Sequence, residues 1–423
     1  MSSETAVSTL SHGKTRRPRR GIDYWTRSQI KKRLEGLTAG RLTVMDPWGE
    51  WSVGERTGLA ADLLVANPGF FRTLALEGEL GAARAYMNGH WQSSQLTNLF
   101  RILLRNTELL DGLEGNFAAV SGAVSRLRHL LNRNTRTGSK KNIHAHYDLG
   151  NDFFALFLDP TRTYSAGIFE QPTATLEQAS ISKLDRICRK LSLRPEDKVI
   201  EIGTGWGSFA LHAASRYGCH VTTTTISAEQ FDYASERVRE RGLEDRITLL
   251  RSDYRDLQGK FDKLVSIEMI EAVGHEYLPQ FFGKCADLLR QDGAMLIQAI
   301  TMPDQRYDRY LKNSDFIRRY IFPGSCVPSL SAIIDAMRGS TDLSLAHLED
   351  IGPHYATTLR AWRERFVQKL DAVRNLGYPP EFQRMWLYYL HYCEAGFAER
   401  YLGTLQLLFS KPRCEMPPLL GAV

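Results

Sequence analysis

The feature that most constrains the fold is a glycine-rich turn within residues 199–207, Val-Ile-Glu-Ile-Gly-Thr-Gly-Trp-Gly. An apolar run typical of a buried strand leads into the turn, and a helical pattern follows it over residues 208–217. Glycine lets a ligand approach the backbone closely, and the start of a helix offers free N–H groups. This order of elements predicts either a site for a nucleotide-type ligand or a plain tight turn between a strand and a helix.

The segments after the turn alternate between strand and helix patterns. They are a strand over residues 219–225, a helix over 226–240, a strand over 247–250 and two buried strands over 261–267 and 294–300. Such alternation is typical of parallel βαβ units and predicts the α/β class. Ligands of open α/β sheets bind at the carboxyl ends of strands, so we expect Gly203, Thr225, Asp253 and Glu271 to line one crevice. No acidic residue ends the second strand, which counts against NAD.

Further motifs follow one another along the chain. They are His-Tyr-Asp-Leu-Gly-Asn at 146–151, Tyr-Ser at 164–165, Thr-Ile-Ser-Ala-Glu-Gln at 225–230, Asp-Tyr-Arg-Asp at 253–256, Met-Ile-Glu-Ala-Val-Gly at 269–274, Tyr-Ile-Phe-Pro-Gly at 320–324 and Thr-Thr-Leu at 357–359. With the glycine turn, they make residues 140–410 resemble the cyclopropane fatty acid synthase family of S-adenosylmethionine-dependent enzymes. The resemblance implies a Rossmann-like methyltransferase sheet with helical insertions and a smaller N-terminal domain. Residues 79–91 resemble part of that smaller domain in the family.

With 423 residues, the chain has room for two domains, each with its own core. We expect four regions, namely a basic, flexible arm over residues 1–36, a small lipid- or membrane-associating domain over 37–115, a linker helix and hinge over 116–140, and a catalytic domain over 141–423.

The resemblance implies chemistry at an alkene. Family members hold an acyl chain with its cis double bond beside the sulfonium methyl group, the alkene attacks the methyl carbon, and loss of a proton closes a cyclopropane. In the family a bound bicarbonate collects that proton. The residues that match its ligands are Glu271, Ile300 and Tyr355, together with Ala166 and Gln298, which stand where many members have Cys and His. A backbone N–H at Ala166 and the amide of Gln298 can still donate hydrogen bonds, so bicarbonate is expected, but these two departures leave its binding and the final product open.

The resemblance also assigns the cofactor contacts. They are Tyr164 and Ser165 over the methionine part, Gly203 and Gly205 beneath it, Thr225 and Gln230 on the ribose and adenine side, and Asp253 and Tyr254 at the adenine edge. Trp206 either contacts the ligand or packs beneath the sheet. His144 and His146 have no third ligand nearby, so no metal site is expected, and His146 is assigned to hydrogen bonding in a loop over the ligand.

The resemblance implies an enzyme that transfers a methylene group from S-adenosylmethionine to the cis double bond of an unsaturated phospholipid acyl chain. One alternative is a related methyltransferase that leaves a methylene-branched chain. Another is a non-catalytic lipid-binding protein, against which the retained Glu271, Tyr355 and glycine turn argue. Six scattered cysteines without a Cys-x-x-Cys pair fit a reducing compartment.

Charge is concentrated at one end of the chain. Residues 1–36 hold nine Lys or Arg and three acidic residues, and this surplus of six equals the net charge of the whole chain. A basic segment suits an anionic membrane surface, whereas no motif supports nucleic acid, and a solvated tail without a partner is the alternative. We therefore expect a cytoplasmic protein, peripheral on the inner membrane face, and a homodimer is among the assemblies left open.

Overall fold

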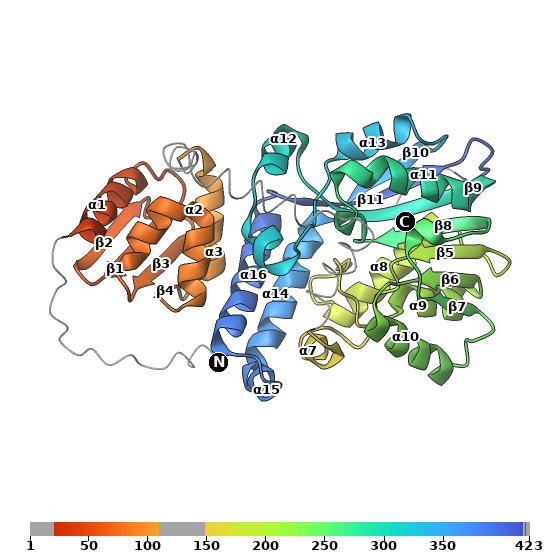
Figure 1. Cartoon of the computed structure of the whole chain (residues 1–423), viewed down its shortest axis with the longest axis horizontal. Helices are drawn as coiled ribbons and strands as arrows, with labels where there is room; N and C mark the ends of the chain where they lie inside the picture. The colour runs from red at the N-terminus through yellow and green to blue at the C-terminus, as the bar shows by residue number, and fades with distance from the viewer. Residues whose placement is uncertain (1–20, 110–148, 418, 420–423) are drawn as a thin grey trace.

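The computed structural model describes residues 21–109, 149–417 and 419. Its larger domain is built on a seven-stranded sheet in the order β10-β11-β9-β8-β5-β6-β7 (Figure 1). The strands are β5 Lys198–Ile202, β6 His220–Thr224, β7 Ile247–Leu250, β8 Phe261–Ile267, β9 Leu289–Thr301, β10 Ser344–Asp350 and β11 Gly403–Ser410. The strands from β9 to β7 run parallel, and β11 and β10 are antiparallel to their neighbours. The predicted α/β class is confirmed.

The strand order reverses beside β5. The chain moves from β5 outward through β6 to β7, then returns to β8 on the other side of β5. In an open parallel sheet, such a reversal leaves a crevice at the carboxyl ends of the two central strands. The glycine turn leaves β5 at this point, so the fold puts it at the mouth of the crevice.

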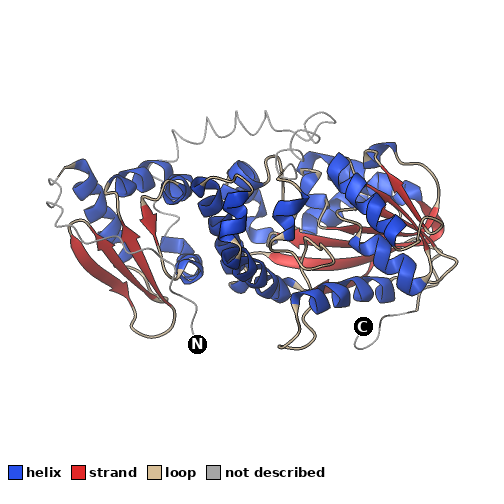
Figure 2. Cartoon of the chain, turned by 90° about the horizontal axis from the view of Figure 1, so that it is seen from below, coloured by secondary structure: helices blue, strands red, loops and turns tan. Residues whose placement is uncertain are grey.

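Helices cover both faces of the sheet (Figure 2). The helices of this domain are α7 Asn151–Ala155, α8 Leu176–Lys190, α9 Ser208–Tyr217, α10 Ala228–Glu240, α11 Leu278–Leu288, α12 Asp304–Lys312 and α13 Leu330–Arg338. Side chains of β5 alternate between two cores: Ile200 and Ile202 pack with residues of α11 and α13, and Val199 packs with residues of α8 and α9. The predictions of a helix at 208–217 and strands at 247–250 and 261–267 are confirmed, because strand and helix periods were both clear there.

Two long helices lie between the sheet and the small domain (Figure 1). They are α14 Gly352–Gln368 and α16 Pro380–Ala398, joined through the short α15 Leu370–Asn375. Most of their aromatic side chains are buried together with those of α7; the ring of Phe153, for example, lies 4.9 Å from that of Trp386. Tyr388, Tyr389 and Phe397 of α16 are likewise buried in this cluster. This aromatic stretch of α16 therefore contributes to the core.

The small N-terminal domain has a four-stranded sheet in the order β2-β1-β3-β4 with three helices. The elements are α1 Ile22–Leu34, β1 Arg41–Asp46, β2 Gly49–Gly54, β3 Ala60–Val65, α2 Gly69–Met87, β4 Trp91–Gln92 and α3 Leu96–Arg105. It contacts α16 through aromatic rings and ion pairs. Tyr86 lies 5.4 Å from Tyr388 between ring centroids, and Arg101 pairs with Glu399 at 2.7 Å.

Helix α1 occupies the second half of the segment predicted as a flexible basic arm over residues 1–36. Ile30 and Leu34 are buried in the core of the small domain, and Arg27 donates to Asp46 at 2.6 Å. The small domain therefore begins at α1 rather than at residue 37. Residues 1–20, the predicted hinge over 116–140, and His144 and His146 lie outside the described residues. In the described part of the chain, no helix has both the length and the apolar character needed to cross a membrane.

Candidate active site

A pocket opens at the carboxyl ends of β5, β6, β7 and β8. All of the predicted cofactor contacts line it, namely Tyr164, Ser165, Gly203, Gly205, Thr225, Gln230, Asp253 and Tyr254. The residues come from the loop before α8, the glycine turn, the start of α10 and the loop after β7. The structure thus brings together in one pocket side chains that are up to 90 positions apart in the sequence; their contacts with a ligand remain predictions.

The floor of this pocket requires glycine. Gly203 and Gly205 have φ angles of +104° and +53°, which side-chain-bearing residues rarely adopt. A Cβ atom at Gly205 would point into open space, with no atom within 4 Å, and one at Gly203 would lie 3.1 Å from the Cγ atom of Met269. The turn therefore forms an open cradle that fits a small ligand against its backbone.

Trp206 combines the two interpretations that its sequence position allowed. The indole lines the pocket and is only 3% exposed. Its Nε1 atom donates to Oδ1 of Asn151 at 2.7 Å, and its ring lies 5.0 Å from that of Phe154. Trp206 therefore supports the pocket wall while its position is fixed by α7.

The side of the pocket formed by α10 and the loop after β7 is held by local hydrogen bonds. Thr225 Oγ1 donates to Oε1 of Gln230 at 2.9 Å at the start of α10. Asp253 accepts two hydrogen bonds from the guanidinium of Arg255, at 2.8 and 2.6 Å. Such a bidentate pair fixes the direction of the carboxylate. Arg255 is thus a pocket residue that the sequence analysis did not assign.

A carboxylate that the sequence analysis left without a role lies at the centre of the site. Glu268 follows β8 directly and lines the pocket. One of its oxygens accepts from the backbone N–H of Ala166 at 3.0 Å and from Nε2 of Gln298 at 2.8 Å. The other accepts from the hydroxyl of Tyr355 at 2.7 Å. Three of the five predicted catalytic residues therefore converge on Glu268 rather than on Glu271.

Glu271 and Ile300, the remaining two, pair with each other. The Oε1 atom of Glu271 accepts from the backbone N–H of Ile300 at 2.5 Å. Its Oε2 atom is buried and has no hydrogen-bond partner among the described residues. Burial, and then the charge of Glu268, raise the pKa of Glu271 to about 8. Two neighbouring buried carboxylates thus have different surroundings, which is a common arrangement in acid-base sites.

A buried lysine adds positive charge to the pocket. Lys183 of α8 is 1% exposed, lines the pocket and donates to Oγ of Ser165 at 2.9 Å. Burial lowers its pKa to about 8, opposed chiefly by the charge of Glu268. Helical periodicity alone marks position 183 as one of the buried positions of α8, but nothing local in the sequence pairs it with Glu268.

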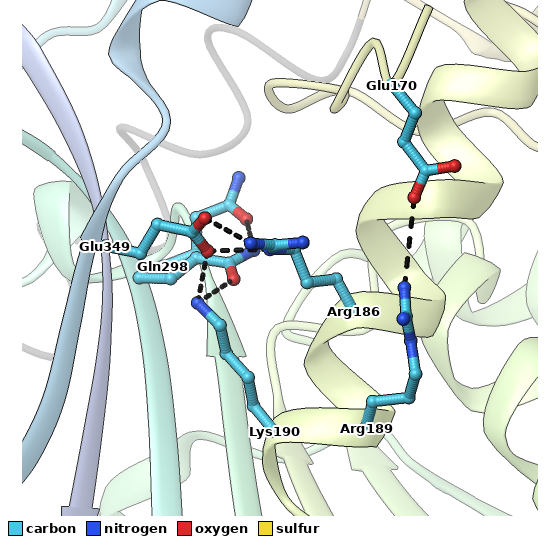
Figure 3. Close-up of polar contacts among 7 residues, drawn as sticks. Glu170, Arg186, Arg189, Lys190, Gln298 and Glu349 are labelled. Atoms are coloured by element: carbon cyan, nitrogen blue, oxygen red, sulfur yellow. Dashed lines mark hydrogen bonds and ion pairs between the residues drawn. The ribbon is translucent and has the colours of Figure 1, made fainter. Parts of the chain in front are cut away.

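The amide of Gln298 is oriented by a chain of buried polar groups. Gln406 Nε2 donates to Oε1 of Gln298 at 3.0 Å, and Lys190 Nζ donates to Oε1 of Gln406 at 2.8 Å. Lys190 also forms an ion pair with Glu349 at 2.6 Å, and Arg186 forms a second ion pair with the same carboxylate (Figure 3). Although Glu349 is partly buried, these two donors lower its pKa to about 2. Because Gln298 Oε1 already accepts, its amide nitrogen is the group that faces Glu268.

The loop that carries Tyr164 is tied to the aromatic helices. The hydroxyl groups of Tyr164 and Tyr389 are 2.9 Å apart, and the ring of Tyr164 lies 5.1 Å from that of Trp362. Within the described ranges, no group of three His, Cys, Asp or Glu residues could hold a metal ion.

Comparisons with known proteins agree with this arrangement. Residues 134–407 match the model of the family described as mycolic acid cyclopropane synthetase. The chain belongs to this family. It is 38% identical to the tuberculostearic acid methyltransferase UfaA1 of Mycobacterium tuberculosis, over 84% of this chain and 86% of that protein. It is 36% identical to the cyclopropane-fatty-acyl-phospholipid synthase of Escherichia coli K12, over 83% and 88% of the two chains.

Solved structures agree as well. The mycolic acid cyclopropane synthase CmaA1, determined with SAH and CTAB, is 31% identical to this chain. The alignment covers 64% of this chain and 98% of CmaA1, with a TM-score of 0.60. This member of the mycolic acid cyclopropane synthetase family is therefore an S-adenosylmethionine-dependent methyltransferase with the expected fold.

Proposed function

We propose that this family member transfers a methylene group from S-adenosylmethionine to the cis double bond of an unsaturated phospholipid acyl chain and forms a cyclopropane. The observation that carries the proposal is the single pocket in which the glycine turn after β5 meets the carboxylate after β8. Similarity to the Escherichia coli cyclopropane-fatty-acyl-phospholipid synthase supports the choice of a phospholipid.

S-adenosylmethionine, when bound, supplies an electrophilic methyl carbon on a sulfonium. Gly203 and Gly205 would support its methionine part, with Tyr164 and Ser165 above it. The adenosine part would contact Thr225, Gln230, Asp253 and Tyr254. The open space over Gly205 fits this assignment, since any side chain there would occupy the ligand's volume.

An alkene is a weak nucleophile, so the protein must orient it and stabilise the positive charge that develops on the chain. Aromatic faces and carboxylates are the groups suited to that task in a site shielded from water. Tyr164, fixed against Trp362, and the carboxylate of Glu268 supply both kinds of group at the pocket. Fixed groups of this kind need no reorganisation during the reaction.

A second candidate is a methyltransferase that leaves a methylene-branched chain from the same alkene. Its support is the 38% identity to the tuberculostearic acid methyltransferase over 84% of the chain. Ala166 and Gln298 also depart from the cyclopropane synthase pattern. The two candidates share the methyl transfer and differ in how the chain cation is quenched.

Expression in a host without cyclopropane lipids, fed methionine with a deuterated methyl group, tests the proposal. We expect phospholipids whose acyl chains gain one carbon carrying two deuterium atoms. Mild catalytic hydrogenation separates the candidates, because an exocyclic methylene takes up hydrogen and a ring does not. If the lipids of these cells are unchanged, although the protein purified from them binds S-adenosylhomocysteine, both candidates are refuted and a non-catalytic lipid-binding protein is favoured.

We further propose that the protein works in the cytoplasm as a peripheral protein on the inner membrane face. The support is the positive surplus at the N-terminal end, which attracts anionic lipid. A substrate chain embedded in a bilayer also requires the enzyme to reach the membrane surface.

A further inference from the structure

Glu268 adopts a backbone conformation that residues other than glycine rarely take. Its φ angle is +48°, and its N–H donates to the carbonyl of Gln298 at 2.7 Å across the β8–β9 pair. Left-handed residues with side chains persist where the surrounding structure fixes them, and they cluster at functional sites. Here the turn of the backbone after β8 directs the carboxylate into the pocket rather than along the sheet.

Hydrogen-bond donors hold both oxygens of the Glu268 carboxylate. The N–H of Ala166 and the amide of Gln298 bind one oxygen, and the hydroxyl of Tyr355 binds the other. Burial raises the pKa of Glu268, and these three hydrogen bonds and the charge of Lys183 oppose that rise. An ionised carboxylate in surroundings poor in water is a stronger base than one at the surface.

We propose that Glu268 is the general base of this enzyme and accepts the proton that the methylated acyl chain loses, in the place that bicarbonate holds in the family. The inference rests on the proposed function, since it concerns the quenching step of that reaction. It assigns Glu268 contact with the reacting chain and leaves Gln298 and Tyr355 as positioning residues.

The reaction balances in atoms and electrons without another reactant. The π electrons of the alkene form a bond to the methyl carbon as the carbon–sulfur bond breaks, which leaves S-adenosylhomocysteine and a carbocation on the chain. A C–H bond of the transferred carbon then breaks, its electrons close the ring, and the proton goes to an oxygen of Glu268. In the branched candidate, a hydride first moves between the former alkene carbons, and the same electrons form an exocyclic double bond. The neutral acid then returns its proton to water.

Bicarbonate does not fit the residues present. The single N–H of Ala166 and the single O–H of Tyr355 are used by Glu268, and the N–H of Ile300 is used by Glu271. A second anion would thus lie beside the carboxylate of Glu268, and these three N–H and O–H donors are already taken. Burying a second negative charge next to a carboxylate without donors of its own is strongly unfavourable.

The polar chain behind Gln298 serves the same arrangement. Lys190, Gln406 and Gln298 each donate to the next group, and the last amide donates to Glu268. Lys190 is fully buried, so its charge sets the direction of the whole chain. A chain that begins at a cation and ends on a donor requires an acceptor at its end, and Glu268 is that acceptor.

The direct test measures whether the wild-type enzyme needs bicarbonate. The full chain is assayed on vesicles of phosphatidylglycerol with oleoyl chains and labelled S-adenosylmethionine, in buffer freed of carbon dioxide, with and without added bicarbonate. We expect equal turnover in both. Turnover that falls on removal of carbon dioxide and returns with bicarbonate would overturn the inference while leaving the proposed function intact. If no labelled lipid forms under either condition, it is the proposed function that fails.

Two variants test the role of Glu268 itself. Glu268→Gln keeps the shape but cannot accept the proton, so turnover should fall by about 100-fold or more, as is common when an acid-base group is lost. Glu268→Gly removes the carboxylate and opens its place, so added bicarbonate or formate should restore part of the turnover. Glu240→Gln, at the exposed end of α10, is the matched control and should keep wild-type turnover.

Two measurements other than turnover complete the test. Calorimetric titration with S-adenosylhomocysteine should give similar affinity for wild type and Glu268→Gln, which shows that the variant is folded. The NMR line of ¹³C-labelled bicarbonate should broaden with Glu268→Gly and stay sharp with wild type. A folded Glu268→Gln with near-normal turnover, or bicarbonate binding by the wild-type site, would each refute the assignment.

Discussion

Replacing Glu271 with Gln should make the protein's stability less sensitive to pH. Glu271 is buried, Ile300 donates to one of its oxygens, and the other has no hydrogen-bond partner among the described residues. Its pKa, raised by burial and by the charge of Glu268 to about 8, means that the folded protein holds a proton there at neutral pH. Gln resembles the protonated acid in shape and has no proton to lose.

The magnitude follows from linkage between protonation and folding. An unfolded chain ionises Glu271 near its ordinary value of 4.5, whereas the folded chain holds the proton until about pH 8. Between these values the folded state binds one more proton, so the free energy of unfolding falls as pH rises, by about 1.4 kcal/mol per pH unit. Between about pH 5 and about pH 7, the difference between Glu271→Gln and wild type should therefore grow by about 3 kcal/mol. One extra buried N–H in Gln costs about 1–3 kcal/mol at every pH, so it shifts this difference without changing its slope.

Urea unfolding followed by tryptophan fluorescence, at a series of pH values, measures this difference. Glu240→Gln makes the same substitution at an exposed position, and its difference from wild type should stay nearly constant. Glu201, whose pKa burial also raises to about 8, remains in both proteins and cancels from the comparison. Parallel pH curves for wild type and Glu271→Gln would show that Glu271 is ionised in the folded protein, and the reasoning would fail.

Three further predictions follow from the pocket, the polar chain and the N-terminal segment. Gly205→Val should weaken binding of S-adenosylhomocysteine by about 100-fold or more in calorimetry. The valine side chain would occupy the space of the ligand, and its left-handed backbone conformation costs about 1–2 kcal/mol. Unchanged affinity in a folded variant would remove the glycine turn from the cofactor site. Gln406→Leu leaves buried Lys190 and Gln298 each without one partner, so the free energy of unfolding in urea should fall by about 1–3 kcal/mol; a neutral effect would contradict the polar chain. Deleting residues 1–20, which carry five basic residues and one acidic residue, should weaken binding to anionic vesicles at low salt and spare neutral ones; equal binding by both proteins would favour a solvated tail.

The sheet and its helices could be predicted because their signals are local. The helix at 208–217 and the strands at 247–250 and 261–267 have clear periods, and the structure reproduces these bounds. Helix α1 was missed for the opposite reason. Its charged residues are typical of a solvated arm. In the structure, however, Arg27 is buried, donates a hydrogen bond to Asp46 and lies over the ring of Trp51. Those partners are nineteen or more positions away, so the local pattern gave no sign of them.

The cofactor pocket could be predicted because parallel strands bring their carboxyl ends to one edge. The catalytic carboxylate could not be assigned in the same way. Glu268 and Glu271 both follow β8, and strand periodicity does not say which side chain turns into the pocket. The φ angle of +48° at Glu268 decides the matter, and nothing in the local pattern marks such a conformation at a glutamate.

The replacement of His by Gln at position 298 is consistent with a carboxylate that belongs to the chain. An imidazole donates or accepts according to its tautomer and charge, and it titrates near neutral pH. An amide does not titrate, and Gln406 already donates to its oxygen, so Gln298 presents an N–H to Glu268 across the whole working range of pH. A diffusible anion has to be recruited at each encounter, whereas Glu268 is held in place by the fold through Ala166 and Tyr355. Ala166 contributes only its backbone, so a small side chain there is sufficient. The two departures from the family pattern and the glutamate after β8 are therefore best understood as parts of one site built around a resident base.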